Sequence, residues 1–294
     1  MSSQATTAAV GISCFICTTE NARSAQVCRR CATPLLVSAA AGAGDRRPHV
    51  FTVLGAPNAG KTVFLAMLLD MLVQRQGDTE TMPRGTFSVE LQQFVLGHLA
   101  SRRFPPKTMR EPNTWNWALY ETRKRGARHG QEFLVPDLSG AALAAEIANP
   151  GSVAIFRPAL NLAGGFILCI DAAAAAKGDA SPDMFALQLV AHLDSVVETK
   201  RKHRIKTPTA VVLCKSDHCP EAVDDPRAFC EANLPRLWSA CASRFDRVEF
   251  FAASVAGSVA FAISAERPDD VEPVPLHIAP RGILEPFDWL LARV

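Results

Sequence analysis

The strongest chemical signal in the sequence is the stretch Gly55-Ala-Pro-Asn-Ala-Gly-Lys-Thr62, a full match to the spacing GxxxxGK[ST]. Glycines let such a loop wrap so that successive backbone N–H groups face phosphates, at the positive end of the following helix dipole. Lys61 would bridge the β- and γ-phosphates, and the Thr62 hydroxyl would coordinate Mg²⁺. A chance match in a Gly/Ala-rich chain is the alternative, and the strand–loop–helix setting disfavours it. The stretch predicts a nucleotide-binding P-loop formed by Gly55, Asn58, Ala59, Gly60, Lys61, Thr62 and Val63.

A second signal is an aspartate at the end of an apolar run, in Phe133-Leu-Val-Pro-Asp-Leu-Ser-Gly140. Asp137 would hold Mg²⁺ through water, and the Gly140 amide would sense the γ-phosphate. This DxxG spacing is weak by itself, because a simple turn after a strand gives the same pattern. Its position downstream of a P-loop favours the functional interpretation.

A third signal is Val211-Val-Leu-Cys-Lys-Ser-Asp217, which is similar to the [NT]KxD base-recognition motif of GTPases. Asp217 would accept hydrogen bonds from guanine N1–H and the 2-amino group, a pair that adenine cannot offer. The aliphatic stem of Lys215 would lie over the base. Cys214 stands where the motif has Asn or Thr, so a side-chain hydrogen bond to the P-loop is lost and guanine selectivity should be looser. A charged turn after a strand is the alternative interpretation of this stretch, and a P-loop ATPase, a further possibility, would require it.

Four of the nine cysteines occur as two CxxC pairs separated by ten residues. Four thiolates at this spacing can bind one tetrahedral Zn²⁺, and the polar stretch between the pairs cannot form a core without a metal. Two disulfides or four unrelated thiols are the alternatives; a reducing compartment and the regular spacing weigh against them. With four thiolates the site has no open position, so we expect a structural zinc ion bound by Cys14, Cys17, Cys28 and Cys31.

Apolar runs alternate with helical patterns along the rest of the chain, which predicts an α/β fold: a mostly parallel sheet with helices on both faces. Residues 34–47 are a stretch of Ala, Gly, Ser and short apolar residues and are expected to be a linker. No element is assigned to residues 258–280. We expect strands at residues 49–55, 115–121, 132–136, 165–171, 208–214 and 248–253, and helices at residues 61–76, 87–102, 183–202, 226–243 and 285–293.

These motifs occur in the order found in the Ras-like (TRAFAC-class) P-loop GTPases, which the chain resembles from residue 48 to residue 294. The resemblance implies that Ser254 and Val255, after the last predicted strand, lie in a loop whose amide contacts guanine O6. A narrower resemblance is to bacterial GTPases of the double-GTPase type from conflict systems. The predicted organisation is a zinc-ribbon-like module at residues 1–33, a linker at 34–47 and a GTPase domain at 48–294.

The sequence departs from the Ras-like pattern at two places. Residues 77–103 indicate an added, largely helical insertion. The family's first switch needs a threonine that reaches Mg²⁺, and Thr108 is our choice over Thr114. Ala141 stands where Ras itself has its water-orienting glutamine, so hydrolysis should be slow without a partner. Lys61, Thr108 and Gly140 are the predicted catalytic residues.

Composition narrows the function further. The net charge is +2, from 31 basic and 29 acidic residues, which argues against a protein that coats nucleic acid or an anionic membrane. No stretch predicts a membrane span or a secretory signal, so we expect a cytoplasmic protein.

The resulting prediction is a Mg²⁺-dependent molecular switch that hydrolyses GTP to GDP and signals to an effector or regulator protein. One hypothesis is that this partner is encoded in the same operon. The alternative is not an enzyme: a pseudo-GTPase scaffold that binds the nucleotide without hydrolysing it.

Overall fold

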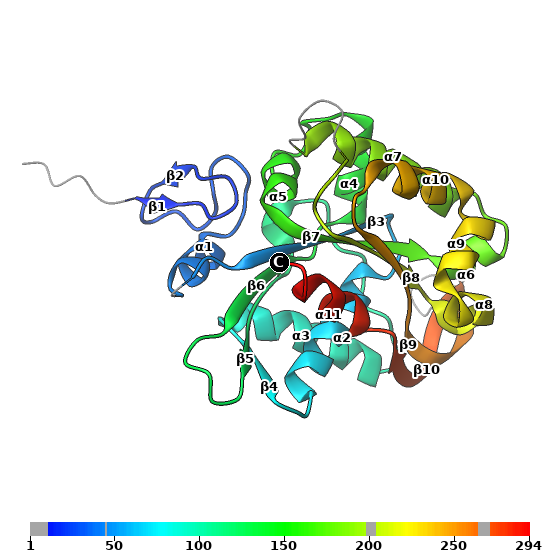
Figure 1. The fold of residues 1–294 in the computed structure, drawn as a ribbon. Helices are drawn as coiled ribbons and strands as arrows, with labels where there is room; N and C mark the ends of the chain where they lie inside the picture. Colours follow the sequence, from blue (N-terminus) through cyan, green and yellow to red (C-terminus); the bar gives the residue numbers. More distant parts are fainter. Residues whose placement is uncertain (1–10, 45, 198–203, 264–270) are drawn as a thin grey trace, which may run out of the picture.

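The computed structural model describes residues 11–44, 46–197, 204–263 and 271–294. A small N-terminal module precedes an α/β domain (Figure 1). The module contains a two-stranded antiparallel sheet, β1 (Ile12–Ser13) and β2 (Glu20–Asn21), followed by helix α1 (Leu35–Gly42). One side of α1 is buried, and the helix lies against strand β5 of the domain.

The domain is built on one eight-stranded sheet with the order β10-β9-β8-β7-β3-β6-β5-β4. Strands β6, β3, β7, β8 and β9 run parallel to one another, whereas β10, β5 and β4 pair antiparallel at the two edges. The expected α/β fold with a mostly parallel sheet is confirmed. The strands are β3 (His49–Gly55), β4 (Thr79–Pro83), β5 (Trp117–Lys124), β6 (Gln131–Pro136), β7 (Ala163–Asp171), β8 (Thr209–Cys214), β9 (Val248–Ile263) and β10 (Val271–Arg281).

Helices cover both faces of the sheet, as Figure 1 shows. One face carries α2 (Lys61–Gln74), α3 (Thr86–Ala100) and α11 (Glu285–Leu291). The other carries α4 (Gly140–Ala148), α5 (Phe156–Leu162), α7 (Ser181–Val196) and α10 (Pro235–Arg244). The shorter helices are α6 (Ala172–Ala176), α8 (Pro220–Asp224), α9 (Pro226–Asn233), η1 (Pro112–Thr114) and η2 (Ser216–His218).

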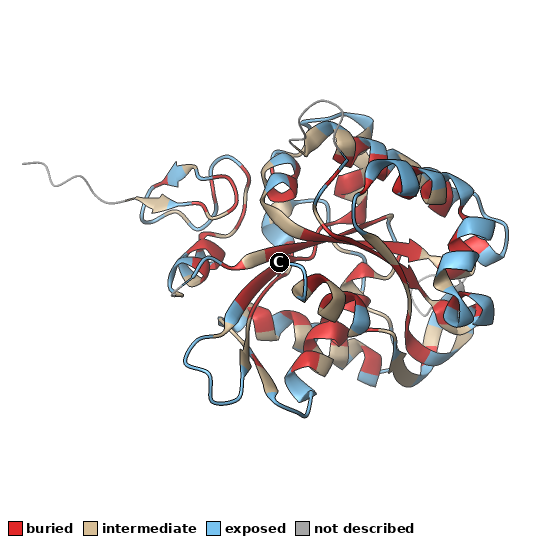
Figure 2. Cartoon of the chain, viewed as in Figure 1, coloured by how far each residue is buried: buried red, intermediate tan, exposed pale blue. Residues whose placement is uncertain are grey.

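Side chains alternate between two cores because successive strand residues point to opposite faces. In β3, Val50 and Leu54 pack into one core, and Phe51 and Val53 into the other. Phe51 meets the ring of Phe287 in α11 edge-on at 5.5 Å. Figure 2 shows the central strands buried and the outer helix faces exposed. This two-sided burial explains why the central strands are continuous apolar runs.

Several local predictions were wrong. The expected linker at residues 34–47 contains helix α1. The segment 77–103 is largely helical, as expected, through α3, and it also supplies edge strand β4, which was not expected. The single helix expected at residues 226–243 is broken into α9 and α10, because Pro235 has no N–H to donate and its ring crowds the preceding turn.

The largest difference is at the end of β9. A strand was expected to stop at residue 253 and a loop to follow, but β9 continues to Ile263 and pairs with β10 as a hairpin. The unassigned segment 258–280 is therefore mostly this hairpin, apart from residues 264–270, which lie outside the described residues. The predicted helix 183–202 ends at Val196, and its last residues also lie outside the described part of the chain. No helix in the described ranges is long and apolar enough to cross a membrane.

Candidate functional site

The P-loop connects the end of β3 to the start of α2. Asn58 has φ 64° and Gly60 has φ 91°, and this left-handed backbone turns the loop into the helix. Lys61 is buried, and its Nζ donates to the carbonyl oxygens of Gly55 at 3.1 Å and Ala56 at 2.8 Å. Burial lowers the pKa of the Lys61 ammonium, and the nearby Asp137 carboxylate opposes that effect. The lysine head is thus held under the loop at the position where phosphate groups would lie.

Three predicted Mg²⁺ ligands from distant parts of the sequence meet beside this lysine. The Thr62 hydroxyl lies 3.0 Å from both carboxylate oxygens of Asp137 and 3.0 Å from the Thr108 hydroxyl. Thr108 and the Asn116 amide each donate to Asp137 Oδ2 at 3.3 Å. Asp137 is fully buried; burial raises its pKa, while the Lys61 charge and these hydrogen bonds lower it.

The chemistry of this cluster fits a magnesium ion. Hydroxyl and carboxylate oxygens are the donors that a hard cation prefers, and here they converge from α2, the segment before β5 and the end of β6. The runner-up Thr114 is exposed and donates to the carbonyl of Glu111 at 2.7 Å instead. Of the two candidate threonines, only Thr108 contacts the cluster in the structure.

Gly140 is packed directly against the P-loop. A Cβ atom at this position would lie 2.6 Å from Pro57 N, 2.7 Å from Lys61 Nζ and 2.8 Å from Ala56 C. Gly140 is also the first residue of α4, whose N-cap Ser139 accepts a hydrogen bond from Ala142 N. The Gly140 position requires glycine because no side chain fits between α4 and the P-loop.

The residues predicted to bind the guanine base lie at the carboxyl ends of β7 and β8. Lys215 has φ 60°, and its ammonium forms an ion pair with Asp171, the last residue of β7. Asp171 also accepts from Ala174 N at 3.0 Å, and so caps α6. The Asp217 carboxylate is largely buried and lies 3.2 Å from His218 Nε2. Cys214 packs against the P-loop: a Cβ atom placed on Gly60 would lie 3.6 Å from the Cβ of Cys214.

Ser254 and Val255 are placed differently from the prediction. Both are buried within β9, and Ser254 pairs with Arg281 of β10, so the expectation of a loop at this position was wrong. A cavity of ≈ 350 Å³ lies beside Asp217, and its walls include Ser254, Phe250 and Arg281. The β9–β10 hairpin therefore forms a wall next to the predicted base site.

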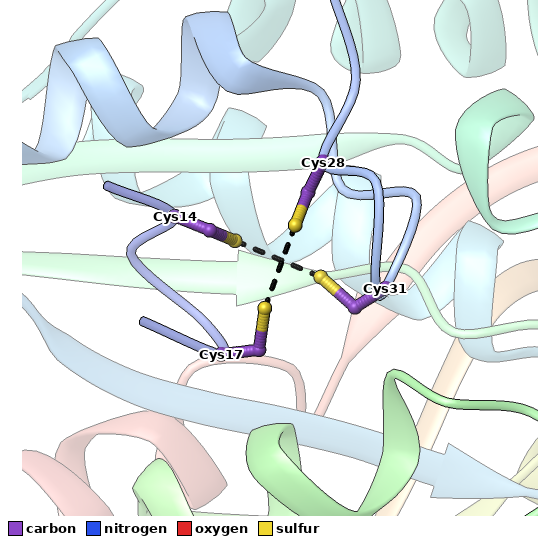
Figure 3. A group of neighbouring side chains, drawn as sticks. All are labelled: Cys14, Cys17, Cys28 and Cys31. Carbon is purple, nitrogen blue, oxygen red and sulfur yellow. Dashed lines mark hydrogen bonds between the residues drawn. The ribbon is translucent and has the colours of Figure 1, made fainter. Parts of the chain in front are cut away.

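The four N-terminal cysteines converge on one point, as Figure 3 shows. All four are buried; the Cys14 and Cys31 sulfurs are 3.6 Å apart, and those of Cys17 and Cys28 are 3.5 Å apart. These distances are too long for disulfides (about 2.05 Å) and close to the roughly 3.8 Å between sulfurs around a tetrahedral Zn²⁺. A hydrogen bond from Cys31 lowers the pKa of the Cys14 thiol to about 4, whereas burial raises that of Cys17. The donor set and its geometry fit a structural zinc ion.

Sequence reasoning missed four residues that shape the nucleotide site. Asn116 contacts Asp137, Ser139 Oγ donates to the Thr108 carbonyl at 3.2 Å, and Trp115 Nε1 donates to the Met109 carbonyl at 2.9 Å. Asp171 pairs with Lys215. Of these four, only Asp171 could have been found from the sequence, because it is an acidic residue at the end of an apolar run.

The chain also has low similarity to solved GTPase structures. The Arl6 BBS3 small GTPase from Trypanosoma brucei with bound GppNp is 12% identical over 83% of this chain and 96% of that chain, with a TM-score of 0.43. The ADP-ribosylation-factor-like protein (small COPII coat GTPase Sar1) from Encephalitozoon cuniculi in complex with GDP is 15% identical over 84% of this chain and 79% of that chain, with a TM-score of 0.37.

No curated protein matches the chain. The sequence model of the Double-GTPase 2 family, however, matches residues 49–267. Because this match spans most of the chain, the protein belongs to the Double-GTPase 2 family.

Proposed function

We propose that this protein is a Mg²⁺-dependent GTP-binding switch that hydrolyses GTP slowly and signals to a protein partner. Family membership supports guanine-nucleotide binding. The observation that carries the proposal is the meeting of Thr62, Thr108 and Asp137 beside the buried Lys61. These three oxygen donors come from separate segments of the chain and lie within hydrogen-bond distance of one another, and the Asp137 carboxylate interacts electrostatically with Lys61.

In the proposed mechanism, water attacks the γ-phosphate in line with the leaving oxygen. Lys61 and the loop amides of residues 58–63 stabilise the developing charge, and the Gly140 amide contacts the γ-phosphate. Bound Mg²⁺ would be held by Thr62 and Thr108, and by Asp137 through water, and would supply further positive charge. Thr108 and residues 137–140 would change position once the γ-phosphate leaves.

Base recognition would use Asp217 as acceptor for guanine and Lys215 as the cover of the ring. Ser254 and Val255 would border the base from β9 rather than from a loop. Since Cys214 replaces the usual Asn or Thr, we expect a weaker preference for guanine over adenine than in a standard GTPase.

Calorimetric titration of the Mg²⁺-loaded protein with non-hydrolysable GTP and ATP analogues tests this proposal. We expect tighter binding of the GTP analogue, and Asp217→Ala should remove the preference without abolishing phosphate binding. Asp224→Ala, on nearby helix α8, is the control and should change neither affinity. Equal affinity of the wild type for both analogues would overturn guanine recognition and leave a P-loop ATPase.

A binding-only scaffold is the second candidate, and Ala141 favours it. This residue stands directly after Gly140 in the first turn of α4, and a methyl group cannot orient an attacking water. Single-turnover hydrolysis separates the two: phosphate release, alone or with added cell extract, supports the switch. Tight GTP binding without release under either condition supports the scaffold.

The N-terminal module would bind one structural Zn²⁺ through Cys14, Cys17, Cys28 and Cys31. We place the boundary of this module near residue 33. As the protein partner of the switch, an effector or regulator protein encoded in the same operon is the first to test. Zinc content of one ion per chain, lost in a Cys14→Ser/Cys31→Ser variant, would support this assignment.

A further inference from the structure

The segment that carries Thr108 is attached to the protein by very few hydrogen bonds. Residues 104–110 lie between α3 and η1 and form no helix or strand. In the described part of the chain, their backbone makes no hydrogen bond to another backbone group. Besides the contacts of the Thr108 hydroxyl with Thr62 and Asp137, two side chains hold the backbone of the segment. Ser139 Oγ donates to the Thr108 carbonyl at 3.2 Å, and Trp115 Nε1 donates to the Met109 carbonyl at 2.9 Å.

These two anchors differ in what they are attached to. Ser139 belongs to the Asp137–Gly140 stretch, which is itself expected to respond to the γ-phosphate. Trp115 belongs to the body of the domain: its side chain is 4% exposed, and its ring lies 5.8 Å from that of Phe156, a fully buried residue of α5. Trp115 is therefore the anchor that ties the segment to a fixed core.

The chain between the segment and this tryptophan folds back tightly. Thr114 Oγ1 donates to the Glu111 carbonyl at 2.7 Å, and Trp115 N donates to the Pro112 carbonyl at 3.3 Å. The turn brings the indole back to a carbonyl six residues earlier. Because Met109 directly follows Thr108, this contact fixes the backbone next to the proposed Mg²⁺ ligand.

We propose that Trp115 is a positioning residue that holds Thr108 within reach of Thr62 and Asp137, and thereby favours the triphosphate over the diphosphate. This inference rests on the proposed function. Triphosphate and Mg²⁺ order a first switch segment, and loss of the γ-phosphate releases it. An anchor that holds the segment in place before binding reduces the cost of ordering it, and only the triphosphate state gains from that.

The neighbouring tryptophan provides a matched control. Trp117 is also buried, at 2% exposed, but its indole nitrogen has no hydrogen-bond partner among the described residues. Replacing either tryptophan by phenylalanine removes a similar part of the ring. Only the change at Trp115 removes a hydrogen bond to the switch segment.

The test compares Trp115→Phe with Trp117→Phe by titration with GppNp and GDP in the presence of Mg²⁺. We expect Trp115→Phe to weaken GppNp binding by roughly three- to tenfold, the effect of one lost hydrogen bond, and to leave GDP binding unchanged. Trp117→Phe should keep the wild-type ratio of the two affinities. An unchanged ratio in Trp115→Phe, or an equal loss for both nucleotides, would overturn the inference.

Trypsin provides a second readout that does not depend on affinity, because Lys107 and Arg110 flank Thr108. Cleavage at these two sites should be faster in Trp115→Phe than in the wild type, and GppNp should slow it less. The exposed Arg125 and Arg128, between β5 and β6, are the internal control and should be cut at the same rate in both proteins. If trypsin cut Lys107 and Arg110 at the same rate in Trp115→Phe as in the wild type, the inference would again be overturned.

The two proposals fail in different ways. If the wild type binds neither GppNp nor GDP, the proposed function fails, whatever the tryptophan variants do. If the wild type binds both and Trp115→Phe behaves like Trp117→Phe, only the role of Trp115 fails.

Discussion

The cysteine cluster and the nucleotide site bring side chains together in opposite ways. The cysteines lie within one short stretch, and two similar turns place them: Thr18 N donates to the Cys14 carbonyl at 2.8 Å, and Ala32 N to the Cys28 carbonyl at 2.9 Å. The nucleotide site instead collects residues from the ends of β3, β6 and β8 and from the segment before β5. One site is local in sequence, and the other depends on the whole sheet.

The two regions should therefore depend on different interactions for their structure. The module has two strands of two residues each and little core of its own, so its structure should depend on the metal. The nucleotide site is supported by two large cores. The module's buried residues join only one of these cores, and most members of that core come from the domain, so we expect the site to keep its geometry without the module. Four predictions test this contrast, from the largest expected effect to the smallest.

Removing zinc should have the largest effect, and only on the module. Chelation, or the Cys14→Ser/Cys31→Ser variant, removes on the order of 10 kcal/mol of metal-binding free energy, so residues 11–33 should lose hydrogen-exchange protection. The affinity for a GTP analogue should stay within about twofold, because distant sites contribute independently. A large loss of nucleotide affinity would show instead that the two regions are coupled.

Gly140→Ala should damage the nucleotide site alone. The new methyl group would overlap Pro57, Ala56 and the Lys61 ammonium. Overpacking of this kind costs about 1–3 kcal/mol, so nucleotide affinity should fall roughly 5- to 150-fold. Gly97→Ala in α3 is the control, because a Cβ there meets no atom within 4 Å. Titration measures the affinities, and zinc content should be unchanged in both variants. Wild-type affinity in Gly140→Ala would contradict the close packing of α4 on the P-loop.

Thr108→Ala should reduce binding of the triphosphate analogue by about tenfold and have little effect on GDP. The physical reason is the loss of a hydroxyl that lies 3.0 Å from Thr62 Oγ1 and 3.3 Å from Asp137 Oδ2. Thr114→Ala, whose hydroxyl contacts only the nearby Glu111 carbonyl, should have a much smaller effect. Mg²⁺-dependent titration checks both; the reverse ranking would make Thr114 the ligand.

Asp171→Asn should give the smallest effect, a loss of about two- to fourfold in guanine-nucleotide affinity. Asparagine keeps the N-cap of α6 but removes the charge that pairs with Lys215, and a partly exposed ion pair contributes below about 1 kcal/mol. Asp183→Asn is the control: this buried carboxylate binds Arg236 and Leu237 N and forms no hydrogen bond with any proposed nucleotide-binding residue in the described part of the chain, so stability should fall and affinity should not. A variant of Asp171 with wild-type affinity would remove this residue from the base site.

Much of the fold and of the site could be predicted from local patterns. The P-loop, the cysteine pairs, the central strands and the double-GTPase resemblance depend on spacing or on runs of apolar residues, and the family match and the sheet confirm the fold and the resemblance. The β9–β10 hairpin could not be predicted, because its prolines and acidic residues are unusual in a strand, and an antiparallel edge strand tolerates them. Helix α1 was missed because it owes its order to burial against β5 rather than to amphipathic periodicity.

The sequence by itself determined which groups are available: the phosphate-binding loop, the buried aspartate after β6, the KxD stretch and four closely spaced thiols. Only the tertiary structure decided which of two threonines reaches Asp137, that Asp171 meets Lys215, and that Trp115 holds the segment next to Thr108. The first two contacts join segments that are far apart in the sequence and that the order of the strands brings together, whereas the Trp115 contact depends on the turn at residues 111–115. A pattern along the sequence records the residue types, whereas the sheet determines which of them become neighbours.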